Sequence, residues 1–260
     1  MPLRYCLLGS GSKGNALYVE GPGGALLVDC GLSARQVLLR LEARGLASHG
    51  IRAILITHEH RDHLAGARVL AKRLRCPVLF TEPTWRAALA KDQRLAEVRR
   101  ESFAPGGGFE LAGLCLRAFS LSHDAVDPVG LEISLGAARL GLATDLGQVT
   151  RLVQARLQGC QALVVESNHD PQMLAQGPYQ EWLKQRVRSR QGHLSNQQGA
   201  ELIESLHHRG LRQVVLAHLS ETNNRPDLAG RAAGRVLERL ASRAELVVAA
   251  QDRPTPVLEI

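Results

Sequence analysis

Short apolar runs alternate with amphipathic segments along the chain. The runs are rich in Val, Leu, Ile and Ala and end in turn-forming or polar residues, as is typical of buried β-strands. They lie at residues 25–28, 54–56, 119–122, 140–144, 162–165 and 214–217. Apolar residues at helical spacing predict helices over residues 34–45, 63–75, 84–98, 196–209 and 228–241. This alternation predicts a layered α/β fold.

Each of these apolar runs leads into a residue that can bind or position a metal ion. These residues are Asp29, His58, His123, Asp145, Glu166 and His218. Sites of α/β proteins lie outside the carboxyl ends of the strands, so one cleft assembled from distant parts of the chain is expected. Asp also forms turns and caps helices, which is the alternative interpretation of Asp29 and Asp145 taken singly.

The densest group of candidate metal ligands directly follows the second run, where the sequence reads Thr57-His58-Glu59-His60-Arg61-Asp62-His63. Imidazole nitrogen and carboxylate oxygen bind borderline and harder divalent cations. Three His and one Asp within six residues are more than one tetrahedral ion takes from a single segment. The spacing therefore predicts a site for two metal ions, and a solvated polar loop is the alternative.

Together these segments resemble the metallo-β-lactamase superfamily, and within it the small bacterial hydrolases of the YycJ/WalJ (VicX) type. The HxHxDH run carries the likeness to the superfamily. The narrower likeness rests on Leu8–Asn15, Leu27–Gly31, Ser122–Ala125, Thr144–Gly147, Glu166–Asp170, Gly192–Asn196 and Ala217–Asn224. The resemblance implies a four-layer αβ/βα sandwich that spans residues 1–260 as one domain, with a dinuclear site at one edge between two facing sheets.

Motif matching to this superfamily implies which residues hold the metals. Two divalent ions, zinc or manganese with iron as a further option, would be bound by His58, His60 and His123, by Asp62, His63 and His218, and by Asp145 between them. Asp29 would orient a ligating imidazole rather than bind an ion. Two such ions lower the pKa of a bridging water, and the resulting hydroxide attacks phosphorus or a carbonyl carbon.

Four residues are candidates for catalysis: Asp62, Asp145, Glu166 and His193. Asp145 would position both ions and Asp62 would orient the nucleophile. In similar transfer-RNA 3′-processing nucleases, a Glu and a His in comparable chain order transfer a proton to the leaving group, and Glu166 and His193 match them. The alternative for His193 is that it merely flanks the helix that follows.

Charge indicates the class of substrate. The formal net charge is +7 and the sequence pI is about 9.6, which favours polyanionic partners. Basic residues cluster at 94–100 and at 184–190, where Arg186 and Arg188 are candidate substrate contacts and a solvated helix face is the alternative. Because only 3% of residues are aromatic, a base-stacking platform is poorly supported, and contacts to the nucleic-acid backbone are expected.

Three other residues are weaker candidates for substrate contact. Lys13 and Asn15 belong to a loop after the first strand that lacks the spacing of a nucleotide-binding P-loop. His169 follows Glu166-Ser167-Asn168, and a local hydrogen bond is its alternative role.

The preferred hypothesis is a dinuclear metal-dependent phosphodiesterase, exonuclease-like and acting on DNA. One alternative is a hydrolase of a small thioester or lactam on the same metals, with affinity nearly insensitive to salt. Another is a non-catalytic nucleic-acid-binding protein with structural metals, whose binding survives substitution of the ligands. Oligomeric state is open.

Length and composition bound the remaining possibilities. With 260 residues and 45% hydrophobic content, the chain can bury one sizeable core. The breaker segment 104–108 is a candidate connection between two halves of a sandwich. No apolar run approaches a membrane span, and a cytoplasmic location is the simplest interpretation. Five cysteines without a CxxC pair argue against a disulfide framework or structural zinc.

Overall fold

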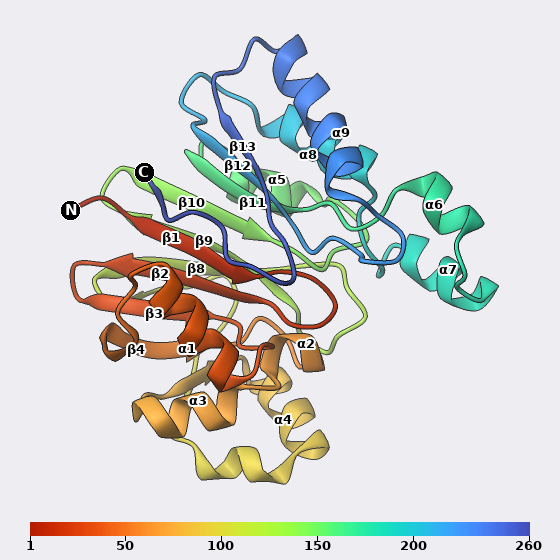
Figure 1. The fold of residues 1–260 in the computed structure, drawn as a ribbon. Helices are drawn as coiled ribbons and strands as arrows, with labels where there is room; N and C mark the ends of the chain where they lie inside the picture. The colour runs from red at the N-terminus through yellow and green to blue at the C-terminus, as the bar shows by residue number, and fades with distance from the viewer.

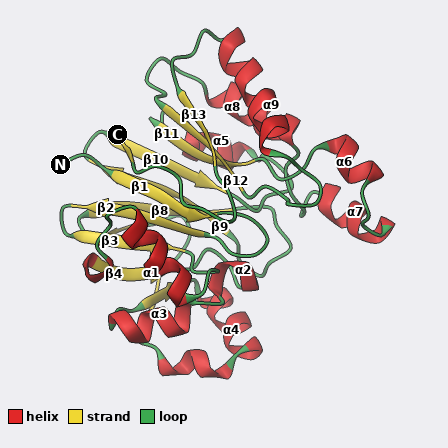
Figure 2. Ribbon diagram, in the orientation of Figure 1, coloured by secondary structure: helices red, strands yellow, loops and turns green.

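Two seven-stranded sheets face each other and carry helices on their outer sides, as the computed structural model of residues 1–260 shows (Figure 1; Figure 2). The first sheet has the order β14 (Leu258–Glu259), β1 (Arg4–Gly9), β2 (Ala16–Gly21), β3 (Gly24–Val28), β4 (Ile51–Leu55), β5 (Val78–Phe80) and β6 (Arg100–Ser102). The second has the order β13 (Glu245–Val248), β12 (Gln213–Ala217), β11 (Ala162–Glu166), β10 (Ala138–Ala143), β9 (Val129–Leu135), β8 (Leu114–Ser120) and β7 (Gly108–Leu111).

Three buried cores separate the four layers. The central core lies between the sheets, and alternate residues of one strand face different cores: Tyr5 and Leu7 of β1 belong to the central core, whereas Cys6 and Leu8 belong to the first outer core. This alternation is the two-residue period of a strand. The sheets must therefore be covered on both faces, which explains their nearly continuous apolar sequences.

Helices cover the two outer faces. Those packed on the first sheet or beside it are α1 (Ala34–Ala43), η1 (Ser48–Gly50), α2 (Arg61–Leu64), α3 (Ala67–Leu74), α4 (Glu82–Lys91) and η2 (Gln93–Glu97). Those of the second half are α5 (Arg151–Leu157), α6 (Pro171–Gln176), α7 (Glu181–Arg188), α8 (Asn196–Leu206) and α9 (Pro226–Arg239). The predicted four-layer αβ/βα sandwich is confirmed. None of the helices combines the length and apolar composition needed to cross a membrane.

Two predicted helices are each divided in the structure. The predicted helix 63–75 is divided at Ala65 and Gly66, where the Gly66 amide donates to the Cys30 carbonyl at 2.7 Å and not to the preceding helical turn. Only glycine fits there, because a Cβ at Gly66 would overlap the carbonyl oxygen of Leu32. The predicted helix 84–98 ends at Lys91. Asp92 leaves the helical conformation and caps the short helix η2 by accepting a hydrogen bond from the Arg94 amide.

The breaker segment 104–108 connects the two halves, as predicted. It runs from β6, the last strand of the first sheet, to β7, the first strand of the second sheet. The division of the chain is not complete, however. The terminal strand β14 returns to the first sheet and pairs antiparallel with β1, with Arg4 opposite Glu259.

Candidate metal centre

Parallel strands from both sheets end at the same edge of the sandwich and place the candidate ligands together. In the first sheet β3 pairs in parallel with β4, and in the second β10, β11 and β12 are parallel neighbours. The loop after β4 supplies His58 and His60, and the short helix α2 that follows it supplies Asp62 and His63. The loops after the strands of the second half supply His123, Asp145, His193 and His218.

Three residues directly after strands adopt the left-handed backbone conformation. Asp29, Asp145 and His218 follow β3, β10 and β12, with φ angles of 61°, 62° and 55°. Non-glycine residues rarely adopt these angles, although Asp and His tolerate them better than most. The Ser10 hydroxyl accepts the His218 amide hydrogen at 2.8 Å. Such backbone strain is concentrated at functional sites, which supports a role for these three positions.

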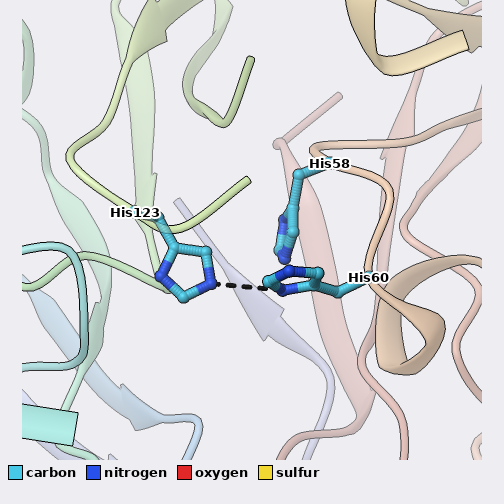
Figure 3. Close-up of side chains that lie close together, drawn as sticks. All are labelled: His58, His60 and His123. Carbon is cyan, nitrogen blue, oxygen red and sulfur yellow. Dashed lines mark hydrogen bonds between the residues drawn. The ribbon is translucent and has the colours of Figure 1, made fainter. Parts of the chain in front are cut away.

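The first group of candidate ligands is His58, His60 and His123 (Figure 3). One ring nitrogen of each lies within 4.8 Å of the others. Nε2 of His123 and Nδ1 of His60 are 3.3 Å apart. Nε2 of His58 is buried and has no hydrogen-bond partner. A buried acceptor without a partner is costly, and a bound cation would satisfy it.

The second group is Asp62, His63 and His218. Oδ2 of Asp62 lies 3.6 Å from His63 Nε2 and 3.4 Å from His218 Nε2. Asp145 lies between the two groups, because its carboxylate is 3.3 Å from His63, 3.4 Å from His218 and 3.9 Å from His123. Its Oδ2 atom is buried and accepts no hydrogen bond. The structure thus brings all seven predicted ligands into one cluster with a carboxylate in its middle.

Neighbouring groups fix the orientation of four imidazoles by contacting their Nδ1 atoms. The partners are Thr57 Oγ1 for His58 at 3.0 Å, Asp29 Oδ2 for His63 at 2.8 Å, the Gly192 carbonyl for His123 at 3.1 Å and Glu166 Oε1 for His218 at 3.0 Å. In each case the Nε2 atom is left on the side of the other candidate ligands, although Nε2 of His63 also lies 3.1 Å from Nδ2 of Asn15. This arrangement is the usual support of metal-binding histidines.

Asp29 holds the first-sheet loop rather than a helix end. Its carboxylate accepts the Thr57 amide hydrogen at 2.8 Å and the Thr57 hydroxyl at 2.9 Å, besides its contact with His63. Helix α1 is capped by Ser33 instead. The capping interpretation of Asp145 fails in the same way, because Thr150 caps α5.

Glu166 is the corresponding carboxylate of the second half. It is fully buried at the end of β11 and accepts the amide hydrogens of Asp145, Leu146 and Leu194. Its Oε1 atom lies 2.8 Å from Nδ1 of His193. Burial alone would raise its pKa, but the adjacent imidazoles hold the pKa of Glu166 below its usual value. Glu166 is therefore a buried anion that joins three loops.

The electrostatics of the cluster favour cations. Burial lowers the pKa of His58 well below its usual value, so its imidazole is neutral and keeps a free lone pair. Burial also opposes charge on His218, yet Asp145, Asp62 and Glu166 raise its pKa to about 10. Ligands must lose such protons when a metal binds. The neutral imidazole of His58, the buried carboxylates that raise the pKa of His218, and the two unpartnered atoms together fit divalent metal ions.

A cavity of about 800 Å³ opens over this cluster. Asp62, His123, Asp145, His193 and His218 line its inner part. Four basic side chains from the first half also line it, namely Arg61, Arg68, Lys91 and Arg94, and Arg186 of α7 lines it as well. Glu59 and Asp92 also line it, so that with Asp62 and Asp145 the lining has four acidic side chains against five basic ones.

The predicted substrate contacts lie in different places. Arg186 lines the metal cavity, whereas Arg188 lines a separate cavity beside α8. Asn15 is buried within the cluster, with Nδ2 3.1 Å from His63 Nε2. Lys13 is exposed and forms an ion pair with Glu221 at 2.7 Å.

His169 lies apart from this cavity. It is 3% exposed, does not line the metal cavity, and forms an isolated β-bridge with Ser195. Burial lowers its pKa to about 4.

Two residues of the site were not singled out from the sequence. Thr57 bridges Asp29 and His58, and its position directly before the HxHxDH run was the available signal. Asp124 follows His123, and its Oδ1 atom lies 3.3 Å from His123 Nε2 and 3.9 Å from His60 Nε2. Its other oxygen accepts a hydrogen bond from Arg186.

Comparison with solved structures defines the class of fold. The metallo-β-lactamase fold protein YhfI from Bacillus subtilis superposes with a TM-score of 0.74 at 17% identity, covering 100% of both chains. Zn(2+)-bound PqqB from Methylobacterium extorquens gives a TM-score of 0.69 at 21% identity, covering 97% of this chain and 99% of that one. The fold is therefore that of the metallo-β-lactamases.

Sequence comparison places the chain within a family. Residues 25–219 match the Beta-lactamase superfamily domain, and the chain belongs to this family. Exodeoxyribonuclease YycJ of Bacillus anthracis is 34% identical over 238 residues, 92% of this chain and 90% of the relative. Exodeoxyribonuclease WalJ of Streptococcus pneumoniae serotype 2 (strain D39 / NCTC 7466) is 36% identical over 230 residues, 87% of this chain and 85% of the relative. The resemblance drawn from the sequence is confirmed.

Proposed function

We propose that this protein is a metal-dependent exonuclease that hydrolyses phosphodiester bonds of DNA. The observation that carries the proposal is the joining of two ligand groups by Asp145 beneath a cavity rimmed with basic side chains. The relatives that match most of the chain at 34% and 36% identity are named exodeoxyribonucleases. The basic rim suits a polyanionic substrate better than a small thioester or lactam.

The proposed ligand sets are His58, His60 and His123 for one ion and Asp62, His63 and His218 for the other, with Asp145 shared. Bound divalent ions would activate a water molecule and stabilise the charge that develops on the phosphate. Zinc or manganese, with iron as a further option, suits this mixture of imidazole and carboxylate. We also propose that residues 1–260 form one domain and that the protein acts in the cytoplasm.

The protein's own groups supply orientation and proton transfer. Asp62, at the mouth of the second ligand group, orients the nucleophile. His193 faces the cavity with its side chain 21% exposed, and its Nδ1 atom is held 2.8 Å from Glu166. His193 would donate a proton from Nε2 to the leaving oxygen while Glu166 stabilises the charged imidazole.

The test is cleavage of end-labelled DNA and RNA, single- and double-stranded, by metal-stripped protein resupplied with manganese or zinc. Asp62→Ala is the inactive control, and Glu42→Ala removes an exposed carboxylate of α1 outside the site as a matched control. We expect metal-dependent shortening of DNA from one end by the native protein and by Glu42→Ala only. Confirmed metal loading without cleavage of any nucleic acid would overturn the proposal in favour of a small-substrate hydrolase.

A further inference from the structure

Residues 171–192 form an arm that extends from the body of the sandwich. Its helices α6 and α7 lie away from both sheets in Figure 1 and Figure 2. Helix α7 contains no buried residue, so packing against the core does not explain it. Between 181 and 190 the arm carries Lys184, Arg186, Arg188 and Arg190 against a single acidic residue, Glu181. An exposed helix with this charge is suited to a polyanion.

The base of the arm is fastened to the loop that carries His123. The carbonyl of Arg190 accepts a hydrogen bond from the Ser122 hydroxyl at 2.8 Å, and the Gln191 carbonyl accepts the Asp124 amide hydrogen at 3.0 Å. The Gly192 carbonyl contacts Nδ1 of His123, as described above. The arm and the metal centre therefore keep a fixed relation to each other.

One aromatic side chain of the arm is open to solvent. Trp182 is 60% exposed, and every other Trp, Tyr and Phe of the chain is buried or half-buried. The indole N–H of Trp182 donates to Gln180 Oε1 at 2.6 Å, which satisfies its polar atom and holds the ring. The exposed ring therefore offers a flat apolar face to a ligand on a helix that is otherwise basic.

Trp182 lies close to the metal cavity along the helix. Trp182 and Arg186 are four residues apart on α7, which places them on one helix face with about 5–6 Å between Cβ atoms. Arg186 lines the metal cavity and bonds to Asp124. On the adjoining face Leu183 and Val187 line a cavity of about 160 Å³ between the arm and the body. Trp182 is thus one helical turn from the rim of the cavity.

We propose that Trp182 stacks on an unpaired base of the DNA strand next to the phosphodiester being cut, while Arg186 contacts the backbone. The inference rests on the proposed function and adds to it a preference for unpaired ends, since a paired and stacked base offers no free face. The low aromatic content argues against a platform of several rings, but it does not bear on one stacking residue. The net positive charge of the arm favours nucleic acid over a protein partner.

Binding of two oligomers under conditions that prevent cleavage distinguishes base stacking from charge attraction. In the presence of a chelator, a short oligo(dT) and an abasic oligodeoxyribose phosphate of equal length are titrated into the protein, so that only the bases differ. The native protein is expected to bind oligo(dT) more tightly by roughly five- to 150-fold, the range for one base–aromatic stack. Stacking of a base on Trp182 should also quench tryptophan fluorescence. The change can be assigned to Trp182, because the other tryptophan, Trp85, is buried.

Three variants make the test specific. Trp182→Ala is expected to reduce the ratio of the two affinities to about one, and Trp182→Phe to retain most of it. Leu39→Ala removes an exposed apolar side chain of α1, 46% exposed, and should leave the ratio unchanged. Because Trp182 is exposed, thermal unfolding of the variants should match that of the native protein.

A native ratio near one, or a Trp182→Ala ratio equal to the native one, would overturn the inference. If DNA cleavage persists in either case, the proposed function stands without it. Loss of self-association in Trp182→Ala with an unchanged ratio would instead make Trp182 a contact between two copies. Absence of both cleavage and nucleic-acid binding in the native protein would overturn the function and the inference together.

Discussion

The two sheets supply the metal centre in different ways. The first sheet provides His58, His60, Asp62 and His63 from one continuous segment, residues 57–63, which comprises the loop after β4 and the start of α2. The second provides its ligands from separate loops, each at the end of a different strand: His123, Asp145 and His218. A short loop can hold its ligands by local geometry. Ligands from distant segments need a common anchor.

Each half has a buried carboxylate that supports its ligands, and the two carboxylates differ in how many segments they hold. Asp29 accepts hydrogen bonds from Thr57 and contacts His63, both in the same loop. Glu166 contacts the amides after β10 and the segment around His193 and His218. Asp29 therefore supports one loop, whereas Glu166 ties several segments together. The difference shows that a supporting carboxylate must contact more segments where the ligands come from more separate parts of the chain.

The largest effect is expected for the ligands that the compact loop supplies. Asp62→Ala or His63→Ala removes a donor of the second ligand group, and we expect turnover to fall by at least about 10³-fold, as for loss of an essential catalytic group. Circular dichroism should show a folded protein, most cleanly for the partly exposed Asp62. Full activity in either variant would contradict the dinuclear mechanism.

Substitution of the two supporting carboxylates compares the halves directly. Asp29→Asn places an amide donor against His63 Nδ1 and shifts the imidazole proton to Nε2, so metal affinity should fall roughly 10- to 100-fold with little change in stability. Glu166→Gln should weaken metal binding to a similar extent and also destabilise the fold by about 1–3 kcal/mol, because its amide would face a buried backbone donor.

Chelator competition measures the metal affinities of these two variants, and thermal unfolding of metal-free protein measures their stability. Equal stability of Asp29→Asn and Glu166→Gln would contradict the contrast between a one-loop and a several-segment support.

Glycines at close backbone contacts allow a steric comparison of the two halves, for which we expect smaller effects. A Cβ at Gly31 would overlap the Asp62 carbonyl in the first half, and one at Gly147 would overlap the Ser189 carbonyl at the base of the arm. Alanine at either position should cost about 1–3 kcal/mol. Gly50→Ala is the matched control, since no heavy atom lies within 4 Å of the added carbon.

Chemical denaturation of the three glycine variants gives these energies. Gly31→Ala should in addition reduce turnover, because it displaces the backbone of Asp62. A Gly31→Ala protein as stable as Gly50→Ala would show that the first-sheet loop adjusts freely.

The smallest effect is expected for the basic residues of α7. Arg186→Ala and Arg188→Ala should each weaken DNA binding, and each lost phosphate contact should reduce the slope of log K against log salt by about 0.7–0.9. Arg35→Ala, on the exposed face of α1, serves as the control. An unchanged slope would identify the substituted residue as part of a solvated helix face. If only Arg188→Ala leaves the slope unchanged, DNA contacts Arg186 at the metal cavity and not Arg188.

Much of the fold was predictable because buried strands and amphipathic helices have distinct periods. The apolar runs 25–28 and 214–217 end with β3 and β12, the run 140–144 passes the end of β10 by one residue, and the helix predicted over 196–209 corresponds to α8, which ends at Leu206. The errors came from contacts between segments. Nothing local to 63–75 indicates that Gly66 must pass under the Leu32 carbonyl, so the break between α2 and α3 was missed.

The same boundary applies to the candidate site. Residue types and the HxHxDH spacing supplied the candidate metal-binding residues, and the resemblance to the superfamily selected seven of them as ligands. The roles of Thr57 and Asp124 were not foreseen, since each depends on a partner that only folding brings near. Arg186 and Arg188 looked equivalent in sequence, yet the helix directs them to different cavities.

By itself the sequence determined the layered α/β class, the family and the chemical character of the centre. These properties follow from local periodicity and from the identities of the donor atoms. The tertiary structure decided which atoms meet: the Gly192 carbonyl and His123 are 69 residues apart, and Glu166 and His218 are 52 apart. Such pairings arise when the two sheets pack through their shared core, a condition that no single segment encodes.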